Sequence, residues 1–314
     1  MLLRTIRYLQ ALTVFFSTKK TELIAYPSAK KAADYTIPDG VKTLSEFAFY
    51  REDINKLVIP DSVVNSATSS FLLCKIDDVT IPDSWTEIPD RAFFGSNIVN
   101  FDIPKGITRI GRSALRSSLE NVTIPSTVTE IGKRAFWGSK IKTVAITGNV
   151  TEVSKEAFRE SGITSITLPD TVTSIGQRSF YMCRDLESVN IPASVRTIGE
   201  MALYDCESLQ SVSLPPSVSR IDNGSFGICS CLDVITILNP NCVISDSPSA
   251  IFSYAETEKM SSVRSCMMKT EIVNIYTILT VLSADTTTRL PKHTRISTAT
   301  NSSPSATLLT YSAT

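Results

Sequence analysis

Apolar residues recur through the middle of this chain with a period close to 22 residues. Each period holds a run in which apolar and polar residues alternate, an aliphatic residue followed by proline, a Val-x-x-Ile segment, and a small residue followed by Phe or Leu. The marker positions are Pro38, Pro60, Pro82, Pro104, Pro125, Thr147, Pro169, Pro192 and Pro215, so the steps are 22, 22, 22, 21, 22, 22, 23 and 23 residues. A fixed period of this length predicts a solenoid of stacked coils.

The pattern inside one period predicts its local structure. Alternating runs with β-branched residues, such as Val144-Ala145-Ile146, predict a strand with one buried face. Proline has no N–H and ends the hydrogen-bonded ladder, after which the Val-x-x-Ile segment predicts a second extended stretch. We expect a helical turn to follow and to carry the small-Phe pair inward. The resulting core column is Phe49, Phe71, Phe93, Leu115, Phe136, Phe158, Phe180, Leu203 and Phe226.

This unit resembles that of the BspA-like leucine-rich repeat family, which runs L-x-x-V-x-I-P-x-x-V-x-x-I-G-x-x-A-F-x-x-C. The resemblance covers Tyr35 to about Pro240. It implies a leucine-rich-repeat solenoid that is mainly β, with stacked short parallel strands and one short helical turn per coil. It also implies a binding scaffold without catalytic residues. The departures from the unit are Thr147 for Pro, Trp85 for Val and Ser66 for Ile.

The period also divides the chain into three parts. Residues 1–34 precede the first clear coil, and their short apolar stretch after Arg4 and Arg7 predicts either a cap on the open core or a signal peptide. Residues 35–258 form the solenoid, with nine clear coils and a degenerate tenth containing Pro240 and Val243. Residues 259–314 lose the period, and we expect disorder from about residue 283 because Ser and Thr dominate there. The apolar residues 272–282 predict a last strand or helix, or no ordered structure, and are too few to span a membrane.

Charge and composition limit the classes of partner and of catalytic site that the chain can have. Lys and Arg total 31, as do Asp and Glu, so we expect no nucleic-acid partner. The single histidine, His293, lies in the C-terminal part, which removes nucleophile–histidine pairs from the solenoid. Asp39, Asp61 and Asp83 follow prolines on consecutive coils, where they predict ordinary turns rather than a calcium site. We therefore expect no enzyme activity, no cofactor and no metal.

Cysteine recurs at one position of the repeat. Cys74, Cys183, Cys206 and Cys229 each lie fourteen residues after the marker proline, where other coils have serine. A position that accepts both Cys and Ser is typical of a small, buried site. One cysteine per coil forms a line rather than a converging set of metal ligands, so we expect buried, reduced thiols.

One further column mixes aromatic and basic residues directly after the core Phe. In successive coils it contains Phe94, Arg116, Trp137, Arg159, Tyr181 and Tyr204. Tyr, Trp and Arg are enriched at the energetic centres of protein interfaces, and alternating rings and guanidinium groups predict cation–π contacts. The alternative is that the rings only cover the turns beneath them. We take these six residues as candidate partner-binding positions.

The function that follows is binding rather than catalysis. We expect a monomeric scaffold for a protein partner, without a membrane span, either intracellular or, in the alternative, secreted or at the cell surface as an adhesion protein. The polar outer face of the main strands, for example at Thr123 and Thr167, is a second candidate surface. N-x-Ser/Thr sequons at Asn121, Asn149, Asn223 and Asn301 matter only if the chain is exported.

Overall fold

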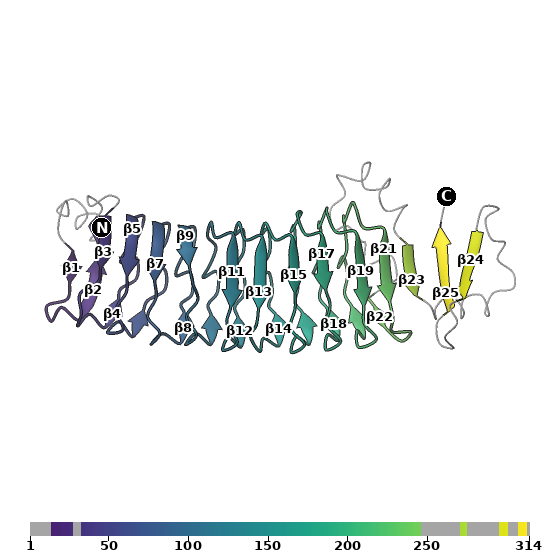
Figure 1. Ribbon diagram of the computed structural model, residues 1–314, viewed down its shortest axis with the longest axis horizontal. Helices are drawn as coiled ribbons and strands as arrows, with labels where there is room; N and C mark the ends of the chain where they lie inside the picture. Colours follow the sequence, from purple (N-terminus) through teal and green to yellow (C-terminus); the bar gives the residue numbers. More distant parts are fainter. Residues whose placement is uncertain (1–13, 28–32, 246–270, 275–294, 301–306, 313–314) are drawn as a thin grey trace. The chain divides into compact units, whose positions relative to one another are not determined.

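The computed structural model describes residues 14–27, 33–245, 271–274, 295–300 and 307–312. The chain divides into two compact units, Met1–Ile163 and Thr164–Thr314, which are described separately. Each unit is a stack of coils in which every coil contributes a longer strand to one sheet and a two-residue strand to another (Figure 1). The predicted solenoid of short parallel strands is therefore present.

The longer strands of the first unit form parallel ladders. Ile54, Ile76 and Ile98 are register partners on consecutive coils, and all three are buried. The coil repeat therefore places like residues above one another, as the period predicts. The first ladder is β3 (Ala33–Thr36), β5 (Asp53–Val58), β7 (Lys75–Thr80) and β9 (Asn97–Phe101), and a separate pair is β11 (Asn121–Ile124) with β13 (Thr143–Ile146).

The Val-x-x-Ile segments of the first unit form the two-residue strands. Ile88, Ile110 and Ile131 are register partners there and are buried. Before the first coil, β1 (Phe15–Phe16) lies antiparallel to β2 (Glu22–Ala25), and β2 continues the parallel ladder. The strands are β2, β4 (Thr43–Leu44), β6 (Asn65–Ser66), β8 (Glu87–Ile88), β10 (Arg109–Ile110), β12 (Glu130–Ile131) and β14 (Glu152–Val153).

The second unit repeats this arrangement. Its longer strands are β15 (Ser165–Thr167), β17 (Ser188–Asn190), β19 (Ser211–Leu214), β21 (Val234–Ile237) and β23 (Glu271–Asn274). Its short strands are β16 (Ser174–Ile175), β18 (Thr197–Ile198), β20 (Arg220–Ile221) and β22 (Val243–Ile244). A hairpin of β24 (Arg295–Thr300) and β25 (Thr307–Ser312) lies in the region where we predicted disorder, and the rest of residues 283–314 lies outside the described residues.

The register of the tenth coil differs from the one that the sequence suggested. Leu214 pairs with Ile237, and Ile221 pairs with Ile244. The residue equivalent to the marker proline is therefore Leu238, and not Pro240. Pairing of the apolar strand residues, rather than the position of a proline, decides the alignment of this coil. Of the apolar residues 272–282, those within β23 form a strand that pairs in parallel with β21, and residues 275–282 lie outside the described residues.

Within each unit, the residues of the predicted core column are buried. Phe71 and Phe93 stack with ring centroids 4.9 Å apart, and Phe136 and Phe158 stack at 5.2 Å with an interplanar angle of 2°. All four rings are fully buried. Trp85, which replaces Val, is also buried, and its indole N–H donates to the carbonyl of Val63 at 2.8 Å.

The predicted helical turn in each coil is wrong: the described residues contain no helix, and this corner is built from successive tight turns. Tyr50 N donates to Phe47 O within the coil, whereas Phe49 N and Arg51 N donate to carbonyls of the next coil. Successive N–H groups therefore donate alternately within the coil and to the next coil. The cause is that Phe47 and Arg51 have left-handed φ angles of 62° and 59°, which a right-handed helix excludes. It also follows that no helix among these residues has the length and apolarity to cross a bilayer.

The main ladder of the first unit is interrupted between β9 and β11, where the marker spacing is 21 residues. Most coils have a second left-handed residue two positions after the core Phe, such as Gly95 or Gly138. The coil of Leu115 is one residue shorter at this point, and none of the residues between Ser113 and Arg134, all of them described, has a left-handed φ. The shortened turn delivers β11 out of pairing register, and a single bridge, Ser96 to Ser117, replaces the ladder.

Candidate protein-binding site

Three of the six candidate residues come together at the corner of the first unit. The guanidinium carbon of Arg116 lies 4.9 Å from the ring centroid of Phe94 and 4.4 Å from that of Trp137. The two ring centroids are 6.3 Å apart. All three side chains are partly exposed. We call Phe94, Arg116 and Trp137 the aromatic–arginine cluster, because the cation is held by two ring faces as the column predicted.

Backbone geometry makes room for this cluster. Gly138 has a φ of +62°, and a Cβ added there would lie 3.2 Å from Arg116 Nε. Glycine therefore serves both the left-handed turn and the close approach of the arginine. Among the described residues, no carboxylate forms an ion pair with Arg116. Its N–H groups remain available for an acceptor from outside the chain.

Arg159, the next basic residue of the column, has a different environment. Its guanidinium pairs with Glu160 at 2.8 Å and with Glu156 at 3.5 Å. Glu156 is buried and also pairs with Arg134 at 2.6 Å. Burial alone would raise the pKa of Glu156, but the hydrogen bond and charge of Arg134, with the charges of Lys133 and Arg159, lower this pKa below its ordinary value. Trp137 donates its indole N–H to Glu160 at 3.3 Å, so the carboxylates here anchor the cluster from one side.

The last two candidates lie in the second unit. Tyr181 and Tyr204 stack with centroids 5.1 Å apart and an interplanar angle of 3°. Arg178 lies 5.8 Å from the ring centroid of Tyr181. Tyr181 is partly exposed, whereas Tyr204 is only 7% exposed, so Tyr204 offers the least surface of the six.

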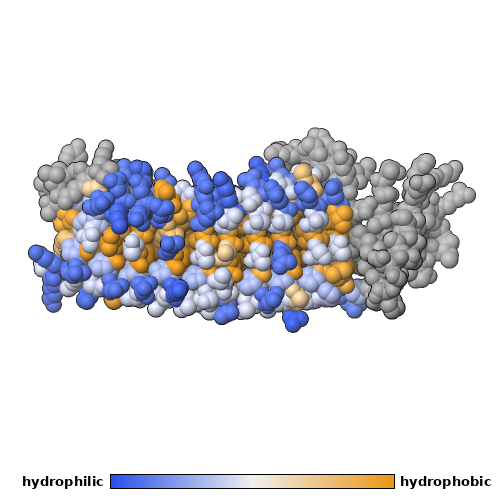
Figure 2. Space-filling view, in the orientation of Figure 1, coloured by the Kyte–Doolittle hydropathy of each residue, from blue (hydrophilic) through white to orange (hydrophobic). Residues whose placement is uncertain are grey.

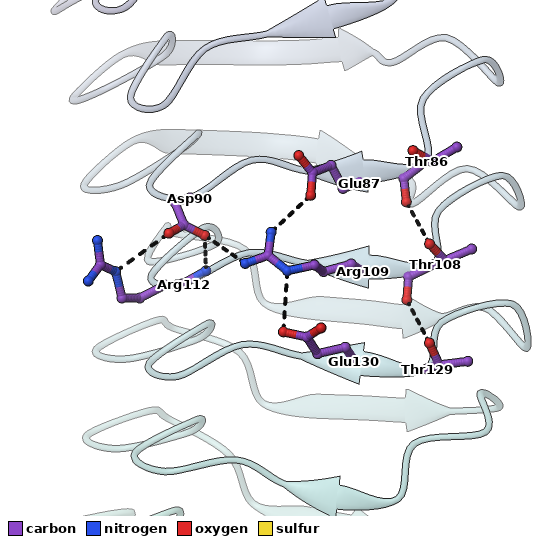
Figure 3. A network of polar contacts seen from close by, with 8 residues as sticks. All are labelled: Thr86, Glu87, Asp90, Thr108, Arg109, Arg112, Thr129 and Glu130. Atoms are coloured by element: carbon purple, nitrogen blue, oxygen red, sulfur yellow. Dashed lines mark hydrogen bonds and ion pairs between the residues drawn. The ribbon is translucent and has the colours of Figure 1, made fainter.

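Sequence reasoning missed a second charged cluster, which lies on the short strands of the first unit (Figure 3). Arg109 pairs with Glu87 at 2.9 Å, with Asp90 at 3.0 Å and with Glu130 at 3.2 Å. Asp90 also accepts the backbone N–H of Arg112 at 2.8 Å. Burial would lower the pKa of Arg109, but these hydrogen bonds raise it, so the charge is permanent. Alignment of the repeats would have revealed the cluster, since Glu87, Arg109 and Glu130 occupy one column.

Threonines beside this cluster bind successive coils to one another. Thr108 Oγ1 donates to the carbonyl of Thr86 at 3.0 Å, and Thr129 Oγ1 donates to the carbonyl of Thr108 at 3.3 Å (Figure 3). Because the carboxylates of the Arg109 cluster are already paired with cations, this surface holds coils together rather than offering a free charge to a partner.

The cysteine column is buried where the structure describes it. Cys74, Cys183, Cys206 and Cys229 are all buried and form no disulfide. Burial raises the pKa of the Cys74 thiol to about 12, and burial with neighbouring thiols raises that of Cys206. In the described part of the chain, no group of three or more His, Cys, Asp or Glu side chains could hold a metal ion. The thiols are therefore part of the core.

The surface of the stacked strands is mixed in character. In Figure 2, hydrophilic residues gather in patches along the upper edge of the view, and below them many hydrophobic residues lie among pale ones. Large apolar side chains exposed in the first unit include Val64 at 51%, Val99 at 60% and Phe47 at 41%. They are scattered along the chain, and singly exposed apolar residues are ordinary on protein surfaces.

Comparison with known proteins identifies the repeat. A family model described as "BspA type Leucine rich repeat region (6 copies)" matches residues 42–164 and 151–267. No curated protein matches the sequence significantly.

Three solved structures are similar to the chain. A leucine-rich repeat protein from Bacteroides ovatus is 19% identical with a TM-score of 0.38, covering 74% of this chain and 88% of its own. A leucine rich cell surface protein from Faecalibacterium prausnitzii is 20% identical with a TM-score of 0.34, covering 78% and 96%. A leucine-rich repeat protein from Eubacterium ventriosum is 20% identical with a TM-score of 0.46, covering 71% and 69%.

Proposed function

This chain belongs to the family of BspA-type leucine rich repeat proteins, and from that premise we propose that it is a non-catalytic scaffold that binds a protein partner. We propose the aromatic–arginine cluster as its contact site. The observation that carries this proposal is the position of Arg116, which lies between two partly exposed rings and has no carboxylate partner among the described residues.

The chemistry of the cluster favours an acidic segment of a partner protein. Arginine presents a planar set of N–H donors that matches a carboxylate in a bidentate pair. The ring faces of Phe94 and Trp137 restrict the guanidinium, so less conformational entropy is lost when a carboxylate binds. The same rings offer apolar area beside the charge. We therefore expect a partner segment that places Glu or Asp next to an apolar side chain.

The intrinsic fluorescence of Trp137 supplies the assay. The chain contains two tryptophans, and Trp85 is only 3% exposed, so a spectral change on binding reports on Trp137. The probe is a short peptide that alternates glutamate and leucine, compared with a matched peptide in which glutamine replaces glutamate. We expect saturable binding of the glutamate peptide, and weaker binding of the glutamine peptide by about tenfold or more, which corresponds to about 1.4 kcal/mol.

Substitutions separate binding from a structural role. Arg116→Gln should lower the affinity for the glutamate peptide by about tenfold. The melting temperature should change by less than about 2 °C, because exposed cation–π contacts contribute only about 0.5–1 kcal/mol to stability. Lys105→Gln removes one exposed positive charge elsewhere in the first unit and is the matched control. If Arg116→Gln lowers the melting temperature and leaves peptide affinity unchanged, the rings and cation only cover the turns, and the proposal is wrong.

A second candidate function is adhesion by an exported form of the protein. The specific observation is that Asn121 and Asn149, both in N-x-Thr sequons, are exposed. Glycan attachment at either asparagine in the native host, detected by mass spectrometry, would support the exported form. Unmodified asparagines in a chain localised inside the cell would support the scaffold there.

A further inference from the structure

The interruption between β9 and β11 leaves two strand edges facing each other without a ladder. No backbone hydrogen bond joins residues 99–102 to residues 119–124, all of which are described. By contrast, β5 pairs on both sides, with β3 and with β7. Unpaired strand edges are templates for hydrogen bonding with an added strand. The backbone groups that face this gap therefore lack the strand partners that β5 has on both sides.

At Ile98, the first residue after the bridge region, a side chain from the next coil makes hydrogen bonds where a paired strand would otherwise make them. Ile98 N donates to Ser118 Oγ at 3.0 Å, and Ser118 Oγ donates back to the carbonyl of Ile98 at 3.0 Å. The same hydroxyl also lies 2.5 Å from Asn97 Oδ1, so its single proton is shared between that side chain and the Ile98 carbonyl, while its oxygen accepts the Ile98 N–H. The following residues of β9 have no such substitute from β11. The coils stay together elsewhere, because Arg109 and Ile110 remain in register with β8.

The facing strands border an open groove of about 630 Å³. Its walls include the exposed side chains of Asn100, Asp102, Glu120 and Asn121, and Lys140 lies at its border. Asp102 has no ion-pair partner among the described residues, and Glu120 has only a distant, solvent-exposed contact of 3.5 Å with Lys142. The groove thus combines unpaired backbone with two accessible carboxylates and one lysine.

We propose that this groove binds an extended, lysine- or arginine-bearing segment of a partner protein by strand addition. The unpaired backbone groups of β9 and β11 select a polypeptide in extended conformation, because only a strand offers alternating N–H and C=O groups at matching spacing. Asp102 and Glu120 select cationic side chains on that strand. The site is distinct from the aromatic–arginine cluster, and its existence does not depend on binding there.

The test uses a short labelled peptide of alternating threonine and lysine with the intact chain. Two further peptides are compared: one with glutamate in place of lysine, and one with lysine backbone nitrogens methylated, which removes donors but keeps charge. We expect binding of the lysine peptide by fluorescence anisotropy, and at least about tenfold weaker binding of the other two. Hydrogen exchange should show faster exchange at β9 and β11 than at β5 in the free protein, and slower exchange there with peptide bound.

Inserting one glycine between Arg116 and Ser117 tests the cause of the break. The insertion restores the length found in the next coil, Trp137-Gly138-Ser139, and with it a left-handed residue at the turn. We expect the ladder between β9 and β11 to form, exchange there to slow, and affinity for the lysine peptide to fall by about tenfold or more.

A substitution that keeps the fold gives an independent measurement. Asp102→Asn removes one carboxylate from the groove and should lower the affinity for the lysine peptide by about threefold to tenfold. Asp61→Asn, at an exposed turn outside the groove, should leave the affinity unchanged.

Three results would overturn the proposal. Equal binding of the methylated peptide would show that charge alone attracts the segment, and equal binding of the glutamate peptide would show that the carboxylates do not select it. Concentration-dependent dimerisation that the glycine insertion abolishes would identify a second copy of the chain as the occupant instead of a cationic partner.

Discussion

Replacement of Phe136 by alanine tests the core of the solenoid most directly. The Phe136 ring is fully buried and stacks on Phe158 at 5.2 Å and 2°, while Leu115 occupies the same column in the coil before it. Emptying a buried aromatic site costs about 3–5 kcal/mol, and a stacked ring pair contributes about 0.5–1.5 kcal/mol beyond its buried area. We therefore expect Phe136→Ala to lower the free energy of unfolding by about 4–5 kcal/mol.

A graded series makes the measurement specific. Phe136→Leu keeps most of the side-chain volume and restores the residue type of Leu115, so it should cost less than about 1.5 kcal/mol. Phe47→Ala is the control, because Phe47 has the same chemistry but is 41% exposed. Its loss should stay below about 1 kcal/mol.

Urea unfolding should be followed by far-ultraviolet circular dichroism and by tryptophan fluorescence together. Coincident transitions are needed because long repeat arrays depart from two-state unfolding. Nearest-neighbour coupling in a solenoid should spread the damage to the coils of Leu115 and Phe158. A loss below about 1 kcal/mol for Phe136→Ala, or one equal to that of Phe47→Ala, would refute the assignment of this column to the core.

Three further predictions follow from single sites. Glu156→Gln should destabilise the protein by about 1–3 kcal/mol at neutral pH. Because the pKa of Glu156 is lowered in the folded state, the loss should be present above a pH of about 4.3 and should shrink as the pH falls below that value. Urea unfolding at a series of pH values measures it. Cys206 should alkylate more slowly in the native protein than the exposed Cys231, measured by mass spectrometry, because its thiol is buried and its pKa is raised; equal rates would contradict this. Gly132→Ala should lower the melting temperature, because the added Cβ would lie 2.8 Å from the backbone of Gly111; an unchanged melting temperature would contradict the close approach of the two coils.

The sequence by itself determined the coil, its period and its buried positions. Spacing of the marker residues and of the core Phe column is a local property of the chain, and stacking like coils leaves no other way to bury residues such as Phe71 and Phe93. The burial of the cysteine column was predictable for the same reason, since a position that alternates between Cys and Ser must be small and enclosed.

Tertiary structure alone decided how each corner turns. The small-Phe pair is compatible with a helix by composition, but Phe49 N and Arg51 N donate to the next coil. Those inter-coil hydrogen bonds offset the cost of left-handed residues, about 1–2 kcal/mol each, and no single coil contains the partner that makes them possible.

Pairing between coils also separated residues that the sequence treats alike. Arg116 and Arg159 occupy one column, yet Arg116 lies between two rings and Arg159 pairs with Glu156 and Glu160. The one-residue shortening after Leu115 is visible in the sequence as a spacing of 21, but its consequence, an unpaired β9 edge, depends on where the next strand arrives. A repeat pattern specifies what each coil buries, whereas the neighbouring coil decides which charges and backbone groups remain free.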